Sequence, residues 1–200
     1  MVIVKGPGGQ KVAYPGGPFY HREFAWLGAE IDKSWHDDYT AIGSFTDFFP
    51  DYFQLSGKSK QQIWGDSSLS IYDAGIGEPI LLRIFNIGFG IQEYHFPSSL
   101  QATQHMSDGR PLPSTLQSDT LRVYPGERFA VMLTPQTYLQ DSIRVLFKSM
   151  YQDKIWGEEA IPVEVSRVFS LDPLTAVQNP VIFPNPAGDF FKIEPGPFGI

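Results

Sequence analysis

The segment EYHFPSSLQATQHMSDGR, from Glu93 to Arg110, contains the side chains best suited to metal chemistry. His95 and His105 are two of the four histidines of the chain, and Met106 directly follows the second. Imidazole and thioether groups together suit copper, so these three residues are the candidate metal ligands. A tight site usually needs about three or four donors. We therefore expect two loop histidines with ordinary hydrogen bonds and no bound metal.

A second group of donors, His36, Asp37 and Asp38, offers ligands for calcium or zinc. The spacing of an EF-hand loop is absent, so we expect a solvated loop. The chain also lacks a G-x-S-x-G nucleophile elbow and a phosphate-binding loop with its lysine. No catalytic residue and no cofactor-binding residue is therefore assigned.

Three carboxylates, Glu30, Asp32 and Glu78, have the chemistry for general acid–base catalysis. Nothing in their spacing brings them together, and we expect ordinary surface or turn carboxylates. The four tryptophans are Trp26, Trp35, Trp64 and Trp156. Such rings can stack on sugars, but we expect most of them to pack in the core.

The composition excludes several classes of protein. The chain has 200 residues, a formal net charge of −7 and no cysteine. Without cysteine there is no disulfide, no iron–sulfur cluster, no cysteine-type zinc site and no blue-copper site. The 15 basic residues are scattered, which argues against a nucleic-acid surface. No apolar run approaches the roughly 18–20 residues that span a bilayer.

Glycine, proline and aromatic residues divide the chain into many short segments, which is typical of an all-β sandwich or barrel. The expected strands lie within 22–32, 52–58, 68–88, 119–135, 142–150 and 160–169, with at most one helical turn, near 174–178. Residues 80–85 alternate between an apolar face and a face that carries Arg83. Asn86 and Gly88 suit a turn with positive φ. A second turn is expected at Pro125–Gly126.

Five segments resemble, in order, the second cupredoxin-like domain of multicopper oxidases. They are FYHREFAWLGAEID, DYFQLSGKS, GEPILLRIFNIG, SDGRPL and LRVYPGERFAVML, and they span roughly residues 20–165. They are similar to the family's REYVLVLSEID-type strand, YFTINGKS, GE-x-V-x-LRI-x-N-x-G, ADG-x-P and L-x-L-x-PGER-x-D-x-L. The resemblance implies an all-β fold, a cupredoxin-like Greek-key β-sandwich.

The same resemblance implies the fold without the copper site. The family's copper sites use His-x-His pairs and a Cys–His segment, and this chain has neither. The segment LFKSMYQDKIWGEE stands where copper-bearing relatives carry an HDH-like element, and it contains no histidine. The middle domain of three-domain members also lacks copper. We therefore expect no cofactor in this chain, copper in other domains of the parent, and neighbouring cupredoxin domains of the same polypeptide as partners.

The tail NPVIFPNPAGDFFKI resembles the start of the C-terminal sorting domain used by type IX secretion, with its YPNPA-x-D-x-F-x-I signature. Three parts are expected. They are 1–18, the end of a preceding domain or a linker; 19–169, the cupredoxin-like domain; and 170–200, a linker and the start of the sorting domain. The signature implies an extracytoplasmic protein, secreted or on the cell surface, with a periplasmic location as the alternative.

Together these features predict a non-catalytic, copper-free structural domain of a secreted multicopper-oxidase-like protein, whose other domains oxidise a substrate with dioxygen. The alternative is an extracellular binding or adhesion module on the same sandwich, with no oxidase activity. His-x-His pairs before residue 1 would favour the first reading. A weak metal-binding or copper-resistance role through His95, His105 and Met106 ranks last.

Overall fold

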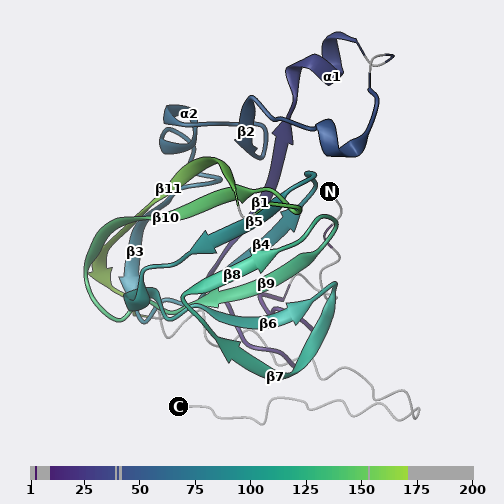
Figure 1. Ribbon diagram of the computed structural model, residues 1–200. Helices are drawn as coiled ribbons and strands as arrows, with labels where there is room; N and C mark the ends of the chain where they lie inside the picture. Colours follow the sequence, from purple (N-terminus) through teal and green to yellow (C-terminus); the bar gives the residue numbers. More distant parts are fainter. Residues whose placement is uncertain (1–2, 4–9, 39, 41, 153, 171–200) are drawn as a thin grey trace, which may run out of the picture. The chain divides into compact units, whose positions relative to one another are not determined.

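The computed structural model describes residues 3, 10–38, 40, 42–152 and 154–170, and most of its regular structure is β-strand (Figure 1). The strands are β1 (Arg22–Ile31), β2 (Tyr52–Leu55), β3 (Ile71–Ile76), β4 (Ile80–Asn86), β5 (Ile91–His95), β6 (Thr103–Ser107), β7 (Arg110–Gln117), β8 (Thr120–Val123), β9 (Arg128–Leu133), β10 (Leu139–Lys148) and β11 (Ile155–Val168). The helical elements are α1 (Lys33–Asp37), α2 (Gln61–Trp64), η3 (Phe45–Asp47) and η4 (Ser98–Leu100). None of the described helices is both long and apolar enough to cross a membrane.

The strands form two sheets. One has six strands in the order β2-β1-β4-β9-β6-β7, and the other has five in the order β3-β11-β10-β5-β8. Most neighbours are antiparallel, but β1 pairs with β4 and β11 pairs with β3 in parallel. A parallel pair cannot be closed by a tight hairpin, so the chain passes through the other sheet between the two partners.

The main core lies between the sheets, because alternate residues of each strand point inward. In β4, Ile80, Leu82 and Ile84 are completely buried there, which confirms the predicted alternation. Trp26 of β1 and Tyr94 of β5 meet in this core with nearly parallel rings, whose centroids are 6.4 Å apart. The contact connects the centres of the two sheets.

A second apolar cluster covers the outer face of the six-stranded sheet. Residues 10–20 form a loop that is closed by a bridge between Val12 and Phe19. Ala13 and Tyr20 of this loop are buried. Their partners in the sheet are Leu81, Met106, Ala130 and Met132. The described part of the N-terminal segment is therefore packed onto the sandwich.

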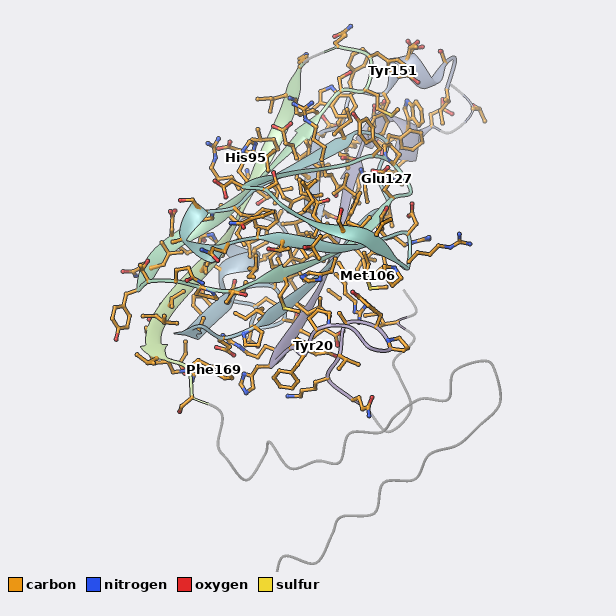
Figure 2. The ribbon with its side chains drawn as sticks, turned by 90° about the horizontal axis from the view of Figure 1, so that it is seen from below. Tyr20, His95, Met106, Glu127, Tyr151 and Phe169 are labelled. Carbon is orange, nitrogen blue, oxygen red and sulfur yellow. The ribbon has the colours of Figure 1, made fainter. Side chains whose placement is uncertain are left out.

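The sandwich has two distinct ends, because β1 and β4 run in the same direction. The turn end, where both strands start, contains the β3–β4 turn around Glu78 and the end of β11. The loop end, where both strands finish, is formed by residues 44–49, 87–90, 124–127, 149–152 and 154–156. Figure 2 shows Tyr151 of the loop end on the opposite side of the molecule from Tyr20 and Phe169.

Every expected strand in the described part of the chain is present, but three strands go beyond the prediction. β5, β6 and β7 lie in a region where the sequence shows no clear alternation, and most of β7 is exposed. The predicted conformation after β4 is wrong, since neither Asn86 nor Gly88 has a positive φ. The Pro125–Gly126 turn is confirmed, with a φ of 85° at Gly126. The predictions for the tail, 171–200, lie outside the described residues.

Candidate functional site

The structure separates the candidate metal ligands. His95 is the last residue of β5 in the five-stranded sheet, whereas His105 and Met106 lie in β6 of the six-stranded sheet. Figure 2 shows His95 and Met106 on different parts of the sandwich. The prediction of two loop histidines is wrong, because each histidine belongs to a strand.

Each of these side chains has its own surroundings. Nε2 of His95 lies 2.9 Å from Oε1 of Glu93. The thioether of Met106 is buried in the outer apolar cluster. His105 occupies a bulge after Gln104, and its Nδ1 atom is buried without a hydrogen-bond partner. Burial lowers the pKa of His105, which favours the neutral imidazole.

The donors present do not fit a copper ion. Within the described residues, no three His, Cys, Asp or Glu side chains are grouped closely enough to hold a metal. The chain also has no cysteine, and a protein copper site needs several converging nitrogen or sulfur donors. His36, Asp37 and Asp38 are exposed, as predicted, but the predicted loop is wrong, because His36 and Asp37 belong to α1 and Asp38 is its C-cap. No step of metal chemistry is therefore assigned to this chain.

The prediction that Glu30, Asp32 and Glu78 are ordinary surface or turn carboxylates is wrong for the surface: all three are buried, although Glu78 does lie in the β3–β4 turn. Their exposed fractions are 7%, 3% and 0%. Asp32 caps α1, since its carboxylate accepts hydrogen bonds from the backbone N–H groups of Ser34 and Phe49, each at 2.8 Å. The second bond fixes the segment that contains Phe49 to the end of β1. Asp32 is thus a structural residue of the loop end.

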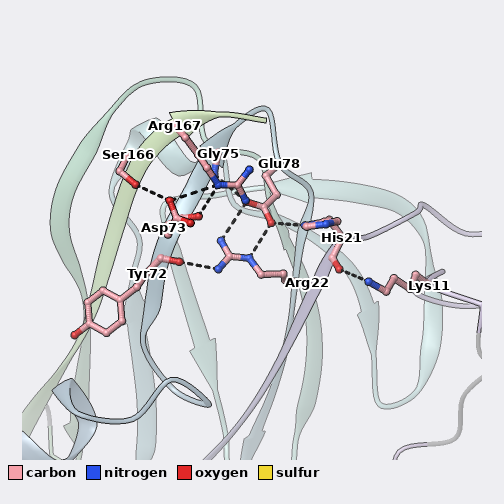
Figure 3. A network of polar contacts seen from close by, with 9 residues as sticks. All are labelled: Lys11, His21, Arg22, Tyr72, Asp73, Gly75, Glu78, Ser166 and Arg167. Atoms are coloured by element: carbon pink, nitrogen blue, oxygen red, sulfur yellow. Dashed lines mark hydrogen bonds and ion pairs between the residues drawn. The ribbon is translucent and has the colours of Figure 1, made fainter. Parts of the chain in front are cut away.

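Glu78 is the centre of a polar network at the turn end (Figure 3). Arg22 donates to its carboxylate from Nε at 2.8 Å and from Nη2 at 3.1 Å, and the backbone N–H of Gly75 donates at 2.8 Å. Nδ1 of His21 lies 2.5 Å from Oε1, and Nη2 of Arg167 lies 3.4 Å from Oε2. Burial alone would raise the pKa of Glu78, but the hydrogen bonds from His21, Gly75 and Arg22 lower it below its usual value.

This network, called the Glu78 clamp below, joins the two sheets. Arg22 belongs to β1 of the six-stranded sheet, and Arg167 belongs to β11 of the five-stranded sheet. Because the Glu78 side chain is completely buried and accepts several hydrogen bonds, no substrate can reach it. The clamp is therefore a structural feature of the fold and not a binding site.

A cavity of about 440 Å³ opens at the loop end, and we call it the aromatic cavity. Its apolar walls include Phe48, Phe49, Phe89, Met150, Tyr151 and Trp156. Its polar groups come from Thr46, Ser149, Gln152 and Lys154. The volume falls within the range of about 300–1,000 Å³ that is usual for small-molecule sites, and such sites combine apolar walls with a few polar groups. The aromatic cavity is therefore the best candidate for a binding site in the described chain.

A cluster of four rings supports the cavity. The ring centroid of Phe48 lies 4.7 Å from that of Phe89, 5.1 Å from that of Trp35 and 5.7 Å from that of Trp156. Tilted and edge-to-face contacts of this kind are favourable beyond the area that they bury. Trp156 is therefore a cavity residue. Trp26 is in the core, but the prediction that most of the tryptophans pack there is wrong, because Trp64 is exposed and Trp35 is only partly buried.

Glu30 lies behind the wall of the cavity formed by Gly88 and Phe89. Its Oε2 atom accepts a hydrogen bond from the backbone N–H of Phe89 at 2.9 Å, while its Oε1 atom is buried without a hydrogen-bond partner. Gly88 has no side chain, which leaves room for the Glu30 carboxyl. A Cβ atom at position 88 would collide with that carboxyl. Burial raises the pKa of Glu30, although the hydrogen bonds from Phe89 and Gly90 oppose that shift.

No family model and no curated protein matches the sequence, but solved structures match the fold. A blue copper oxidase from Nitrosomonas europaea matches with a TM-score of 0.55 at 20% identity, over 73% of this chain and 44% of that protein. Fet3p, a multicopper oxidase that functions in iron import, matches with a TM-score of 0.55 at 13% identity, over 80% of this chain and 31% of that protein. The multicopper oxidase mgLAC matches with a TM-score of 0.53 at 19% identity, over 77% of this chain and 47% of that protein.

The chain is a cupredoxin-like β-sandwich. The two sheets and the solved relatives confirm the predicted all-β Greek-key fold. The chain spans less than half the length of each of these proteins. At this level of identity the likeness concerns the fold alone, because one fold hosts many functions.

Sequence patterns do not predict the aromatic cavity of this cupredoxin-like domain. Its residues come from loops that are far apart along the chain, and no single loop carries a known motif. One signal is present in hindsight. The segments SFTDFF, NIGFG and SMYQDKIW place aromatic rings where no strand alternation requires them.

Proposed function

We propose that this chain is a copper-free, non-catalytic cupredoxin-like domain of a secreted multicopper-oxidase-like protein. Its role is architectural: it holds neighbouring cupredoxin domains of the same polypeptide at a fixed spacing. The oxidation of a substrate by dioxygen belongs to copper-bearing domains elsewhere in the parent. This domain supplies the rigid two-sheet frame between them.

The separation of the candidate donors is the observation that carries the proposal. His95 and His105 lie in different sheets, and Met106 is buried in an apolar cluster. A copper ion cannot gather them without breaking strand pairing in β5 or β6. The similarity of the fold to multicopper oxidases supports the proposed setting.

The proposed location outside the cytoplasm has separate support. The tail NPVIFPNPAGDFFKI resembles the opening of a type IX sorting domain. A reporter fused to a sorting domain whose opening is replaced by residues 170–200 tests this location in a bacterium that has type IX secretion, with the same fusion lacking that opening as the control. The reporter should reach the cell surface or the medium, and its retention inside the cell would count against the location.

Copper stoichiometry tests the copper-free role. The purified 200-residue chain is loaded with Cu(I) or Cu(II), freed of excess metal, and assayed for bound copper and for its visible spectrum. Less than about a tenth of an equivalent is expected, because no set of converging donors exists among the described residues. One tight equivalent that is lost in the His95→Ala/His105→Ala double variant, and kept in the exposed control His36→Ala, would overturn the proposal.

A second candidate function is an extracellular binding module on the same sandwich. The aromatic cavity favours it, because a domain that only spaces its neighbours has no need of an open site lined by aromatic rings. The parent's upstream sequence distinguishes the two. His-x-His pairs before residue 1 support the oxidase setting, and their absence supports the binding module.

A further inference from the structure

We propose that the aromatic cavity binds planar aromatic compounds that carry one negative charge. The site goes beyond the architectural role and does not depend on copper or on a neighbouring domain. Three features of the cavity lead to this class of ligand: its aromatic rings, the single charge among its described lining residues, and the hydrogen bonds that hold residues 149–152 and 154.

Aromatic rings from several segments of the chain line the cavity. Phe89 and Trp156 belong to the fixed ring cluster beneath the cavity. Phe49 and Tyr151 stand on two different segments of its rim, and they are 64% and 73% exposed. Single exposed rings are common on protein surfaces, but exposed apolar side chains that gather at one cavity mark a binding site. A planar ring that enters between them would stack on faces that water now covers.

The charge of the lining selects an anion. Among the described lining residues, Lys154 is the only charged one, and none is a carboxylate. Among these described residues a cationic ligand would meet one positive charge and no carboxylate, whereas a carboxylate or sulfonate would pair with the ammonium group. Gln152 and Thr46 offer further hydrogen bonds to such a group.

Hydrogen bonds hold the described residues between β10 and β11, namely 149–152 and 154, which include Gln152 and Lys154. The hydroxyl oxygen of Ser149 accepts hydrogen bonds from the backbone N–H groups of Tyr151 and Gln152, each at 3.2 Å. The backbone N–H of Ser149 donates to the carbonyl of Lys154 at 2.9 Å. These bonds hold the backbone of Tyr151, Gln152 and Lys154 at the cavity, so that the ligand does not have to order that backbone on binding.

The test uses two matched probes and the 200-residue chain. The anionic probe is 2-naphthoate, and its neutral analogue is 2-naphthalenemethanol. Isothermal titration calorimetry should show saturable binding of 2-naphthoate with one site per chain. The variants Phe49→Ala and Tyr151→Ala should each weaken it by about tenfold, because a stacked ring face is lost. These residues are exposed, so the fold should remain intact, which thermal unfolding checks.

The charge is tested separately with Lys154→Met. This variant should weaken the binding of 2-naphthoate by about tenfold and leave the binding of 2-naphthalenemethanol unchanged, because only the anion loses a charge-assisted hydrogen bond. Tyr138→Ala and Lys11→Met remove a 63% exposed ring and a charge from residues that do not line the cavity, and they should change neither affinity. The proposal is overturned if 2-naphthoate does not saturate, if Phe49→Ala and Tyr151→Ala bind it normally, or if Lys154→Met affects both probes equally.

Discussion

Arg22 binds Glu78 through two hydrogen bonds, of 2.8 and 3.1 Å, although the Glu78 carboxylate is completely shielded from water. A charge in such a place is tolerated only when it is paired and hydrogen-bonded. Here the partners come from both sheets, since Arg167 of β11 approaches the same carboxylate. The pair therefore closes the turn end of the sandwich.

Replacing Glu78 with glutamine should destabilise the domain by roughly 3 kcal/mol, because Arg22 and Arg167 would remain beside an uncharged amide. Urea unfolding followed by tryptophan fluorescence measures the change. The matched control is Glu158→Gln, which breaks the exposed pair between Arg144 and Glu158. Its cost should stay below about 1 kcal/mol. Equal effects of the two variants would show that the clamp contributes no more than a surface ion pair.

The Glu78 clamp should also make stability depend on pH in the acid range. The folded state lowers the pKa of Glu78, so the unfolded state takes up its proton first as the pH falls. The stabilisation is complete above the usual carboxyl pKa and is lost as the pH falls through the folded pKa. Urea midpoints measured between about pH 5 and pH 2 should fall less steeply for Glu78→Gln than for the parent. If the urea midpoints of the two proteins fall in parallel with pH, Glu78 is not a source of the pH dependence.

Glu30 should behave in the opposite way. Burial raises its pKa, so the folded state holds the proton more tightly and stability declines as the pH rises through the folded pKa. Glu30→Gln keeps an oxygen for the N–H of Phe89 and removes the buried charge. It should stabilise the domain at pH 7 by about 1 kcal/mol. Glu30→Leu is the control, and it should be destabilising because the N–H of Phe89 loses its acceptor. A loss of stability in Glu30→Gln would contradict this reading.

Local sequence patterns are enough to predict eight of the eleven described strands, but not β5, β6 and β7. The alternation in β4 and β10 survives because each strand has one face on a common core, and a period of two is visible in any single strand. β7 was missed because neither of its faces is buried enough to impose that alternation. The fold class therefore follows from the strands that form the core.

The buried carboxylates and the cavity needed the three-dimensional structure. Glu78 is 56 residues from Arg22 and 89 residues from Arg167 in sequence, so its neighbours in the chain do not show that it is paired and buried. The cavity likewise depends on the meeting of loops from β4–β5 and β10–β11, together with the segment around Phe48. The residue type alone does not show whether a Glu is buried in an ion pair or whether a Phe lines a cavity.

Gly28 provides a test of the buried polar contacts in the core. A Cβ atom at this position in β1 would collide with the side-chain amide of Gln92, which is completely buried and donates to Asn86 at 2.9 Å. Gly28→Ala should therefore destabilise the domain by about 2 kcal/mol, measured by urea unfolding, because the amide must move and lose that bond. Gly43→Ala is the control, since the nearest atom to its Cβ lies at an ordinary 3.6 Å, and it should be nearly neutral. In the double variant with Gln92→Ala, the penalty of Gly28→Ala should largely disappear, because the colliding amide is gone. An unchanged penalty in that background would mean that the glycine is required by the backbone of β1 rather than by Gln92.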